Sequence, residues 1–376
     1  MNKNKSLHIV SFAIPYPPDY GGIIDVFYKI KALWKNNIEI ILHCFDYDRS
    51  RNDELLNYCK EVHYYPRKRS LFYFFSLKPF IVRSRANKTL LKRLLKDDYP
   101  VLFEGLHSSF YTDQLININR TVILRAHNVE YNYYQGLAGG ESHILKKFYY
   151  YLEAIKIKNY EKKVIQKLVL AAISPSDYQY FHAINPNTIY LPVFHSNDQV
   201  HSKPGRGNFI LFHGNLSVNE NISAVKYILK NICSNTDYPF IIAGKNPPRK
   251  LIQVITKHNN VELIQDPSEK TMKNLIRDAH IHLLITFQDT GIKLKLINAL
   301  FGGRFCLANP AMVKNTPLEP FVHIADTPQQ FVSEIHQLMK HPFTEDQLNN
   351  REHSLLKIVN NHLNAQKLIT LLELNL

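Results

Sequence analysis

Residues 284–310, LITFQDTGIKLKLINALFGGRFCLANP, indicate the fold of this chain. The apolar run Ile281 to Ile285 predicts a buried parallel strand. A polar turn follows, and apolar residues then recur at helical spacing until Gly302-Gly303, which predicts the end of a helix. A second strand is predicted from Arg304 to Ala308, because the apolar run stops before Pro310. Strand, turn, helix and strand together form a βαβ unit.

The turn inside this unit has the composition of an anion-binding site. Gly291 allows a ligand to approach the backbone, and the predicted helix behind it begins with free N–H groups. Lys293 and Lys295 fall in the predicted first turn, although the helix N-terminus already carries partial positive charge. The pattern therefore indicates a phosphate site. A surface helix with two solvated lysines is the alternative interpretation.

The composition places the chain among globular proteins with anionic partners. A length of 376 residues with 45% hydrophobic residues predicts two domains, each with its own core. The net charge of +14 favours nucleic acid, phosphorylated metabolites or an anionic membrane. Four scattered cysteines without a C-x-x-C pair are typical of a reduced, cytoplasmic protein. No apolar stretch is as long as a membrane span requires.

A second strand–loop–helix unit is predicted at the beginning of the chain. Leu7 to Ile14 is expected to be a strand rather than a signal peptide, because His8 interrupts it and prolines end it. The loop after it ends in Gly21-Gly22, and the next residues repeat at helical spacing. The strand Ile38 to Phe45 completes the unit. The loop lacks the G-x-G-x-x-G spacing, so it indicates a nucleotide site only weakly.

Polar residues follow several of the predicted strands. His127 comes just after the strand Thr121 to Leu124, where parallel sheets bind their ligands, although it is also compatible with an ordinary loop histidine. His107 has a similar but less favourable position. Asp46 and Asp48 form a D-x-D triplet that is able to hold a metal and a diphosphate, and two solvated turn aspartates are the favoured interpretation.

Two basic segments are candidates for a surface interaction. Residues 64–85 mix aromatics with six arginines and lysines, which suits a membrane surface, a packed surface segment or stacking on nucleic-acid bases. Residues 146–170 predict one long, basic, amphipathic helix, either solvated or lying on an anionic membrane.

The linker between the predicted domains is HSNDQVHSKPGRGN, residues 195–208, because it is polar and contains proline and glycine. After it the strand–helix pattern restarts. We therefore predict an N-terminal domain, 1–195, a C-terminal domain, 209–355, and a final helical segment, 356–376.

The chain resembles the GT-B nucleotide-sugar glycosyltransferases, specifically the glycogen-synthase-like retaining group known as glycosyltransferase family 4. The resemblance covers nearly the whole chain and depends on motifs that occur in the family's order. These are PYPPDYGG, RAHNVEYNYY, FHGNLSVNEN, IIAGKNPP, TGIKLKLINALFGG and IADTPQQF. It implies an α/β protein with two Rossmann-like domains that face a central cleft. The final helix would return to the first domain.

The resemblance also implies roles for individual residues. Gly21 and Gly22 match the family's glycine loop near the diphosphate and sugar, and His127 matches a histidine that faces the donor sugar. Further donor-binding candidates come from the second domain: Gly214, Asn215, Lys245, Thr290, Gly291, Ile292, Lys295 and Asn298. Lys293 and His127 are the expected catalytic residues. No obligatory metal or other cofactor is expected.

The chain departs from the family at the glutamate pair of this βα turn. The matching positions are Thr290 and Asn298, and neither is acidic. We expect a retaining transferase that moves a sugar from a nucleotide sugar to a glycan or lipid-linked acceptor in cell-surface polysaccharide synthesis. It would be cytoplasmic, with a possible peripheral location on an anionic membrane and no nucleic-acid partner. The alternative is an inactive GT-B module that binds a nucleotide sugar or glycan for a partner enzyme.

Overall fold

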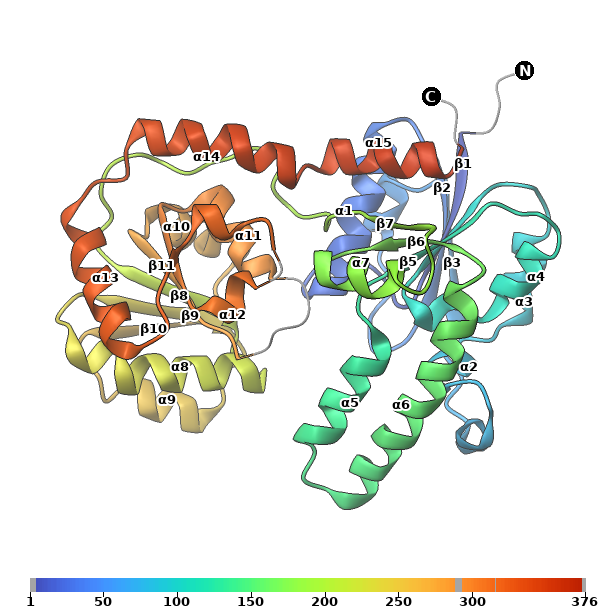
Figure 1. The fold of residues 1–376 in the computed structure, drawn as a ribbon, viewed down its shortest axis with the longest axis horizontal. Helices are drawn as coiled ribbons and strands as arrows, with labels where there is room; N and C mark the ends of the chain where they lie inside the picture. Colours follow the sequence, from blue (N-terminus) through green and yellow to red (C-terminus); the bar gives the residue numbers. More distant parts are fainter. Residues whose placement is uncertain (1–4, 288–292, 315, 374–376) are drawn as a thin grey trace. The chain divides into compact units, whose positions relative to one another are not determined.

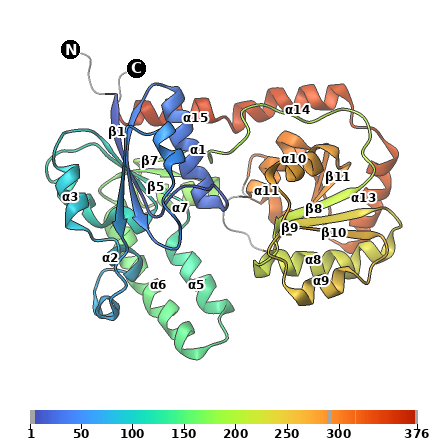
Figure 2. The same ribbon diagram turned by 180° about the vertical axis from the view of Figure 1, so that it is seen from behind.

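The computed structural model describes residues 5–287, 293–314 and 316–373, which form two compact units (Figure 1). The first unit comprises the described parts of 1–196 and 359–376, and the second comprises those of 197–358. Each unit contains a parallel sheet with helices packed against it (Figure 2). The predicted α/β class with two Rossmann-like domains is therefore confirmed.

The first unit is built on a seven-stranded sheet in the order β3-β2-β1-β4-β5-β6-β7. All its strand pairs are parallel, and β1 pairs with β2 on one side and β4 on the other. The strands are β1 (Ser6–Ser11), β2 (Glu39–Asp46), β3 (Glu61–Pro66), β4 (Val101–Glu104), β5 (Val122–Ala126), β6 (Val169–Ala172) and β7 (Thr188–Tyr190).

Apolar residues cover both faces of this sheet, as expected for parallel strands joined by helices. One face packs against α1 (Gly21–Lys35) and α15 (Asn361–Leu371). The helix at the end of the chain thus belongs to the first unit. The other face packs against short helices and one long one. These elements are α2 (Phe80–Arg83), α3 (Lys88–Leu94), α4 (Thr112–Ile116), α6 (Ile144–Ile165) and α7 (Pro175–His182).

The long helix that the sequence predicted is present as α6, and it forms a hairpin with a further helix, α5 (Glu130–Gly140). α5 and α6 pack against each other and are joined by residues 141–143. Figures 1 and 2 show the hairpin extending away from the sheet of the first unit. The predicted helix is confirmed over residues 146–165, but it was extended too far at its end, because α6 starts at Ile144 and stops at Ile165 before the strand β6. Short 3-10 segments complete the unit: η1 (Asp53–Asn57), η2 (Leu71–Phe75) and η3 (Leu106–Tyr111).

The second unit repeats this topology with six strands in the order β10-β9-β8-β11-β12-β13. The strands are β8 (Ile210–Asn215), β9 (Phe240–Lys245), β10 (Val261–Gln265), β11 (Ile281–Leu284), β12 (Phe305–Ala308) and β13 (His323–Ile324). All pairs are again parallel, and β8 pairs with both β9 and β11.

Helices also cover both faces of the second sheet. They are α8 (Asn219–Asn231), α9 (Arg249–Ile255), α10 (Glu269–Asp278), α11 (Leu294–Gly302), α12 (Pro310–Val313), α13 (Pro328–Lys340) and α14 (Glu345–Ile358). The remaining 3-10 segments are η4 (Cys233–Asn235) and η5 (Glu319–Phe321). The segment 197–208 runs along this unit, where Gly205 exchanges two backbone hydrogen bonds with Phe343.

Candidate functional site

Each sheet has one point at which its strand order reverses. In the first unit this point lies between β1 and β4, and in the second between β8 and β11. Ligands of open α/β sheets bind beyond the carboxyl ends of the strands at such a point. α1 begins with Gly21 and Gly22 at the first point, and β8 ends with Gly214 and Asn215 at the second.

A fully buried lysine lies beside the first reversal point. Lys29 Nζ, from α1, donates to Asp25 Oδ2 at 2.8 Å and to both oxygens of Glu104 at 2.7 and 2.9 Å. All three side chains are 0% exposed. The helix places Asp25 and Lys29 one turn apart on its buried face, and β4 ends at Glu104. Such a cluster is tolerable inside a protein only when every charge is paired and hydrogen-bonded.

Arg125 completes the charge balance. Its guanidinium, from β5, donates to both oxygens of Asp25 at 3.1 and 2.9 Å, and the backbone N–H of Phe194 also donates to Asp25 at 2.8 Å. Burial alone would raise the pKa of Asp25, but Arg125 and Lys29 hold it well below its ordinary value. Burial likewise opposes ionisation of Glu104, and Lys29 and His127 lower its pKa. Two carboxylates thus face two cations.

His127 has one ring nitrogen fixed by this cluster and the other unpaired. Its Nε2 lies 3.0 Å from Glu104 Oε2, so Nε2 carries the proton when the ring is neutral. Nδ1 is buried without a hydrogen-bond partner among the described residues. A side chain at Gly22 would place its Cβ 3.6 Å from this Nδ1. The start of α1 and His127 are therefore neighbours, as the sequence predicted for a ligand site, and Nδ1 can accept a hydrogen bond.

Asp25, Glu104 and His127 have the residue types of a metal site. Their ligand atoms lie within 4.8 Å of one another. The Lys29 ammonium, however, already contacts both carboxylates, and the Arg125 guanidinium takes the remaining face of Asp25. A divalent ion would add two charges where the cations already balance the acids. These residues do not fit a metal.

A second buried acid group lies next to the same edge. The N–H of Glu130, at the start of α5, donates to Glu161 Oε1 of α6 at 3.1 Å. Burial raises the pKa of each carboxyl to about 8. For Glu130, the negative charge of the nearby Glu161 contributes to this rise. His107 Nδ1 lies 3.8 Å from Glu130 Oε1, and burial holds the pKa of His107 well below its ordinary value. Both acids therefore hold their protons more tightly than ordinary carboxyl groups.

The reversal point of the second unit contains a half-buried lysine. Lys295 Nζ donates to Asn221 Oδ1 at 2.9 Å and lies 5.4 Å from the centre of the Phe212 ring. Asn221 in turn donates from Nδ2 to the carbonyl of Asn215 at 2.9 Å. Burial lowers the pKa of Lys295 to about 8; Glu220 opposes this shift and Lys293 adds to it. A bound anion would raise the pKa of this lysine again.

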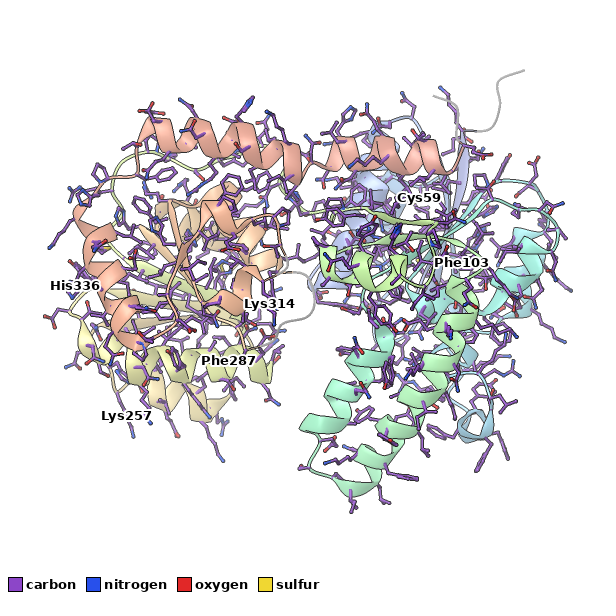
Figure 3. The ribbon with its side chains drawn as sticks, in the orientation of Figure 1. Cys59, Phe103, Lys257, Phe287, Lys314 and His336 are labelled. Carbon is purple, nitrogen blue, oxygen red and sulfur yellow. The ribbon has the colours of Figure 1, made fainter. Side chains whose placement is uncertain are left out.

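The end of β11 is tied to the same cluster. The Thr286 hydroxyl donates to Glu220 Oε1, at the start of α8. Asn309, after β12, accepts from the N–H of Thr286 at 3.1 Å and donates to its carbonyl at 2.7 Å. Phe287, labelled in Figure 3, follows and packs edge-on against Tyr227 of α8. These contacts hold the backbone that leads toward α11.

Of the predicted donor residues, the structure places Gly214, Asn215, Lys245 and Lys295 at this edge. Asn215 is the register partner of the exposed Lys245 across β8 and β9. α11 begins at Leu294 with Lys293 as its N-cap, so the prediction that Lys293 stands inside the first turn was wrong by one position. Thr290, Gly291 and Ile292 lie outside the described residues.

Asn298 lies on α11 with its side chain half-buried. Its Oδ1 accepts a hydrogen bond from Asn197 Nδ2 at 3.0 Å. The contact occupies the amide oxygen of Asn298 and holds its side chain against Asn197, the first residue of segment 197–208. The predicted ribose-binding role of Asn298 remains a prediction.

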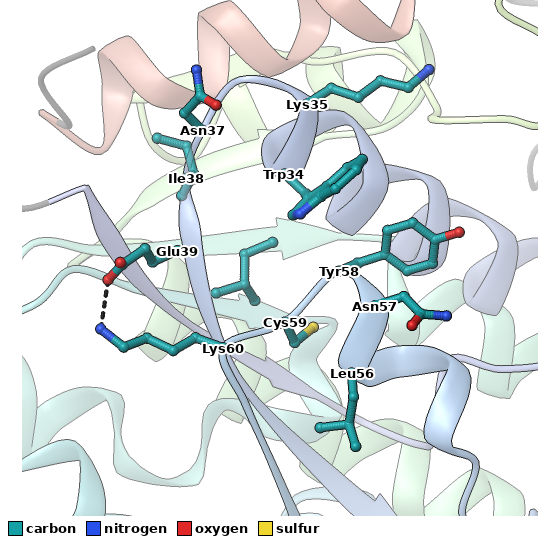
Figure 4. Close-up of a pocket in the computed structure, with 11 residues that line it drawn as sticks. Trp34, Lys35, Asn37, Ile38, Glu39, Leu56, Asn57, Tyr58, Cys59 and Lys60 are labelled. Carbon is teal, nitrogen blue, oxygen red and sulfur yellow. Dashed lines mark hydrogen bonds and ion pairs between the residues drawn. The ribbon is translucent and has the colours of Figure 1, made fainter.

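Two surface pockets differ in their relation to the strand ends. One of about 540 Å³ adjoins the carboxyl ends of β12 and β13 and includes Asn309, Lys314 and Asp326. It shares Asn309 with the Thr286 cluster and is therefore part of the candidate nucleotide edge. The other lies beside Trp34 and the Glu39–Lys60 ion pair (Figure 4). Because Glu39 starts β2, this second pocket is at the amino ends of the strands, away from the reversal point.

The D-x-D triplet has the turn structure that was favoured. Asp46, the last residue of β2, pairs with Arg51 at 3.0 Å, and Asp48 pairs with Arg69 at 3.0 Å. The Tyr47 ring lies 4.3 Å from the guanidinium carbons of both Arg67 and Arg69. Each carboxylate thus has its own arginine.

The sequence analysis missed the residues that support the site. The sequence did contain one signal for them: Asp25 and Lys29 are two charged residues, four positions apart, on an otherwise apolar helix face. Glu104 and Arg125 are charged residues at the ends of buried strands. Their mutual contacts connect positions far apart in the sequence, so the pairing itself has no local signature. The same holds for Glu220, Asn221 and Thr286 in the second unit.

Comparison with known proteins supports the fold. No protein-family model matches the chain. It is 28% identical over 323 residues to an uncharacterized 44.6 kDa protein in the cps region of Klebsiella pneumoniae, covering 80% of this chain and 81% of that protein. Among solved structures, a glycosyltransferase from Rickettsia africae has a TM-score of 0.65 at 12% identity, with 99% of this chain and 98% of that one covered.

Two further solved structures give the same result. Anabaena HepE, in complex with UDP and glucose, has a TM-score of 0.62 at 10% identity and covers 98% of this chain and 99% of its own. The lipopolysaccharide outer core galactosyltransferase WaaB has a TM-score of 0.59 at 13% identity, covering 97% and 99%. The chain thus has the GT-B fold of glycosyltransferases. In its described part, no helix is long and apolar enough to cross a membrane.

Proposed function

We propose that the protein is a glycosyltransferase that moves a sugar from a nucleotide-sugar donor to a glycan or lipid-linked acceptor. The observation that supports this most is the state of His127 at the β1–β4 reversal point. The Glu104–Lys29 pair fixes the proton on Nε2 and leaves Nδ1 unpaired beside Gly22. A neutral, oriented imidazole can accept a hydrogen bond from a sugar hydroxyl.

The second unit is proposed to bind the nucleoside diphosphate. The departing diphosphate gains negative charge, and cations held in place before the reaction stabilise that charge. Lys293 and Lys295 stand at the start of α11, and Lys245 ends β9. The backbone of Gly214, Thr290, Gly291 and Ile292 would approach the phosphates. Asn298 would contact the ribose, and Asn215 would shape the loop.

Retention of configuration is the proposed stereochemical outcome. Asp25 and Glu104, the acids nearest to His127 among the described residues, are saturated by cations and are unsuited to act as nucleophile or base. The donor's own phosphate would then take the acceptor's proton as the diphosphate departs. The cations named above would replace an obligatory metal.

The comparisons support a role in cell-surface polysaccharide synthesis. One relative is encoded in a cps region, and WaaB acts on the lipopolysaccharide outer core. Enzymes that use cytoplasmic nucleotide sugars and lipid-linked acceptors work at the inner face of a membrane. We propose the same location for this protein, with a nucleotide sugar and a glycan or lipid-linked acceptor as partners.

A GT-B module without activity is the second candidate, and the residue types of α11 favour it. Asn298 replaces an acid, and its amide oxygen already accepts from Asn197. Such a module would bind a nucleotide sugar or glycan for a partner enzyme. It predicts nucleotide binding without turnover.

A donor panel tests the proposal. A nucleotide sugar that binds only the folded state raises the melting temperature, so a thermal-shift screen identifies the donor. Release of nucleoside diphosphate from that donor then distinguishes an enzyme from a binding module. If none of the nucleotide sugars binds, the transferase fails, and so does a module that binds a nucleotide sugar.

A further inference from the structure

The outer face of α6 carries an unpartnered apolar stripe. Each member has another member three or four residues away, so together they share one broad helix face. They are exposed near the hairpin tip, from 78% for Ile144 to 42% for Leu152. The stripe comprises Ile144, Leu145, Phe148, Tyr151, Leu152 and Ile155. A helix in a globular protein normally buries such a face.

A second apolar segment lies beside this stripe. Phe72, Phe75 and Leu77, in and after η2, are 82%, 87% and 96% exposed. Lys156 Nζ of α6 donates to the Phe74 carbonyl at 2.6 Å, and the Phe74 ring packs edge-on against Tyr149 at 5.2 Å. Both ribbon views show η2 next to α6. We call the two sets together the hairpin apolar surface.

The charges of α6 are segregated around this surface. The helix has six lysines and two glutamates. Both glutamates, Glu153 and Glu161, are buried, at 1% and 3% exposure. Five of the lysines are exposed. Along the outer face, the residues up to Ile155 are apolar, and Lys158, Lys162 and Lys163 follow them. The apolar end of the helix is thus followed by a basic band with no exposed acid on α6.

We propose that the hairpin apolar surface docks onto an anionic lipid bilayer. Its apolar side chains would enter the acyl boundary, and the lysines behind them would contact the headgroups. This proposal deepens the proposed function, because it identifies the surface that would bring the enzyme to a lipid-linked acceptor. A second copy of the chain is a poorer occupant, since two α6 helices would bring their lysines together without exposed acids to pair with.

The first experiment measures flotation of the full chain with vesicles of two compositions. One is phosphatidylcholine alone, and the other is an equal mixture of phosphatidylcholine and phosphatidylglycerol. We expect binding to the mixed vesicles and at least about tenfold weaker binding to the neutral ones. Binding that is equal on both, or absent from the mixed vesicles, would overturn the proposal.

Substitutions locate the contact. The triple variant Phe75→Ser, Ile144→Ser, Phe148→Ser changes only exposed side chains and is expected to lose at least about tenfold in vesicle affinity. Lys162→Gln with Lys163→Gln should lose roughly fivefold per lysine. The matched controls are Val254→Ser and Lys250→Gln with Lys257→Gln, which are exposed positions of the second unit. Figure 3 labels Lys257, which lies in the turn after α9.

Two further readouts separate the possible outcomes. Nucleotide-induced thermal shift should be unchanged in the triple variant, so loss of vesicle binding with intact nucleotide binding supports the proposal. Light scattering after size-exclusion chromatography measures the oligomeric state. A wild-type dimer that becomes monomeric in the triple variant would assign the surface to a second copy and overturn the membrane proposal. Failure of the donor panel with retained vesicle binding would contradict the proposed function alone.

Discussion

His127 Nε2 and Glu104 Oε2 are 3.0 Å apart, and Glu104 is itself bound by the buried Lys29 ammonium. This chain of contacts connects α1, β4 and β5 at the point where the strand order reverses. It fixes the protonated nitrogen of the imidazole and directs the other one toward Gly22. The proposed chemistry depends on this orientation, and the contacts that produce it can be broken one at a time.

Lys29→Met should destabilise the protein by about 3–5 kcal/mol, because it leaves Glu104 as a buried carboxylate without its main cation. Urea unfolding measures the difference. The matched control is Lys60→Met, which breaks the half-exposed Glu39–Lys60 pair (Figure 4) and should alter stability little. Equal stability of Lys29→Met and the wild type would mean that the buried cluster does not hold the site together.

Glu104→Gln tests the orientation of His127 separately from the nucleotide site. The neutral amide removes the charge that fixes the Nε2 proton, so transfer should fall more than about tenfold while nucleotide affinity stays the same. Steady-state kinetics and calorimetry measure the two quantities. The control is Glu262→Gln on the exposed side of β10. Unchanged transfer in Glu104→Gln would argue against a role for the His127 orientation.

The lowered pKa of Lys295 leads us to expect that nucleotide binding depends on pH. The folded pKa of this lysine is lowered to about 8 by burial, and a bound diphosphate would raise it, so binding takes up a proton. Affinity should therefore fall as the pH rises through 8. Calorimetry in buffers of different ionisation enthalpy measures the proton uptake. Lys295→Arg, which stays charged, should bind with a nearly flat pH profile. An identical profile in wild type and Lys295→Arg would place the diphosphate elsewhere.

The sequence predicted the repeated strand–helix units well, because buried parallel strands have continuous apolar runs. It failed for β3, whose sequence EVHYYP is mixed polar and aromatic, and for β13, which has two residues. It placed the glycines and His127 at strand ends, which the sheet topology brings to one edge. It missed Lys29, because a buried lysine is recognisable only once its acids from other elements are known.

Glu161 makes stability depend on pH. Its pKa rises from 4.5 in the unfolded chain to about 8 in the folded one, so the folded state binds the extra proton between these values. The stabilisation that Glu161 contributes to the free energy of unfolding is full below pH 4.5 and is lost as the pH rises toward 8. The free energy of unfolding falls by at most about 1.4 kcal/mol per pH unit over this range. Glu161→Gln should flatten the fall in melting temperature over this range, and a slope equal to that of the wild type would refute the assignment.

Lys293→Ala tests the cation at the α11 N-cap. If Lys293 contacts the donor diphosphate, the variant should lose roughly 1.5–3 kcal/mol of nucleotide binding without unfolding. Lys257→Ala, at an exposed position just after α9, is the control for a general loss of positive charge in the second unit. Unchanged nucleotide affinity in Lys293→Ala would remove this residue from the phosphate site.

The most direct test of the central claim is the rate of nucleoside diphosphate release from the donor found in the thermal-shift panel. The measurement uses the wild type and His127→Ala, in the presence of EDTA. The account predicts turnover by the wild type and a rate lower by about 100-fold in His127→Ala, with nucleotide affinity unchanged. Tight nucleotide binding without any release by the wild type would contradict the account and identify a binding module.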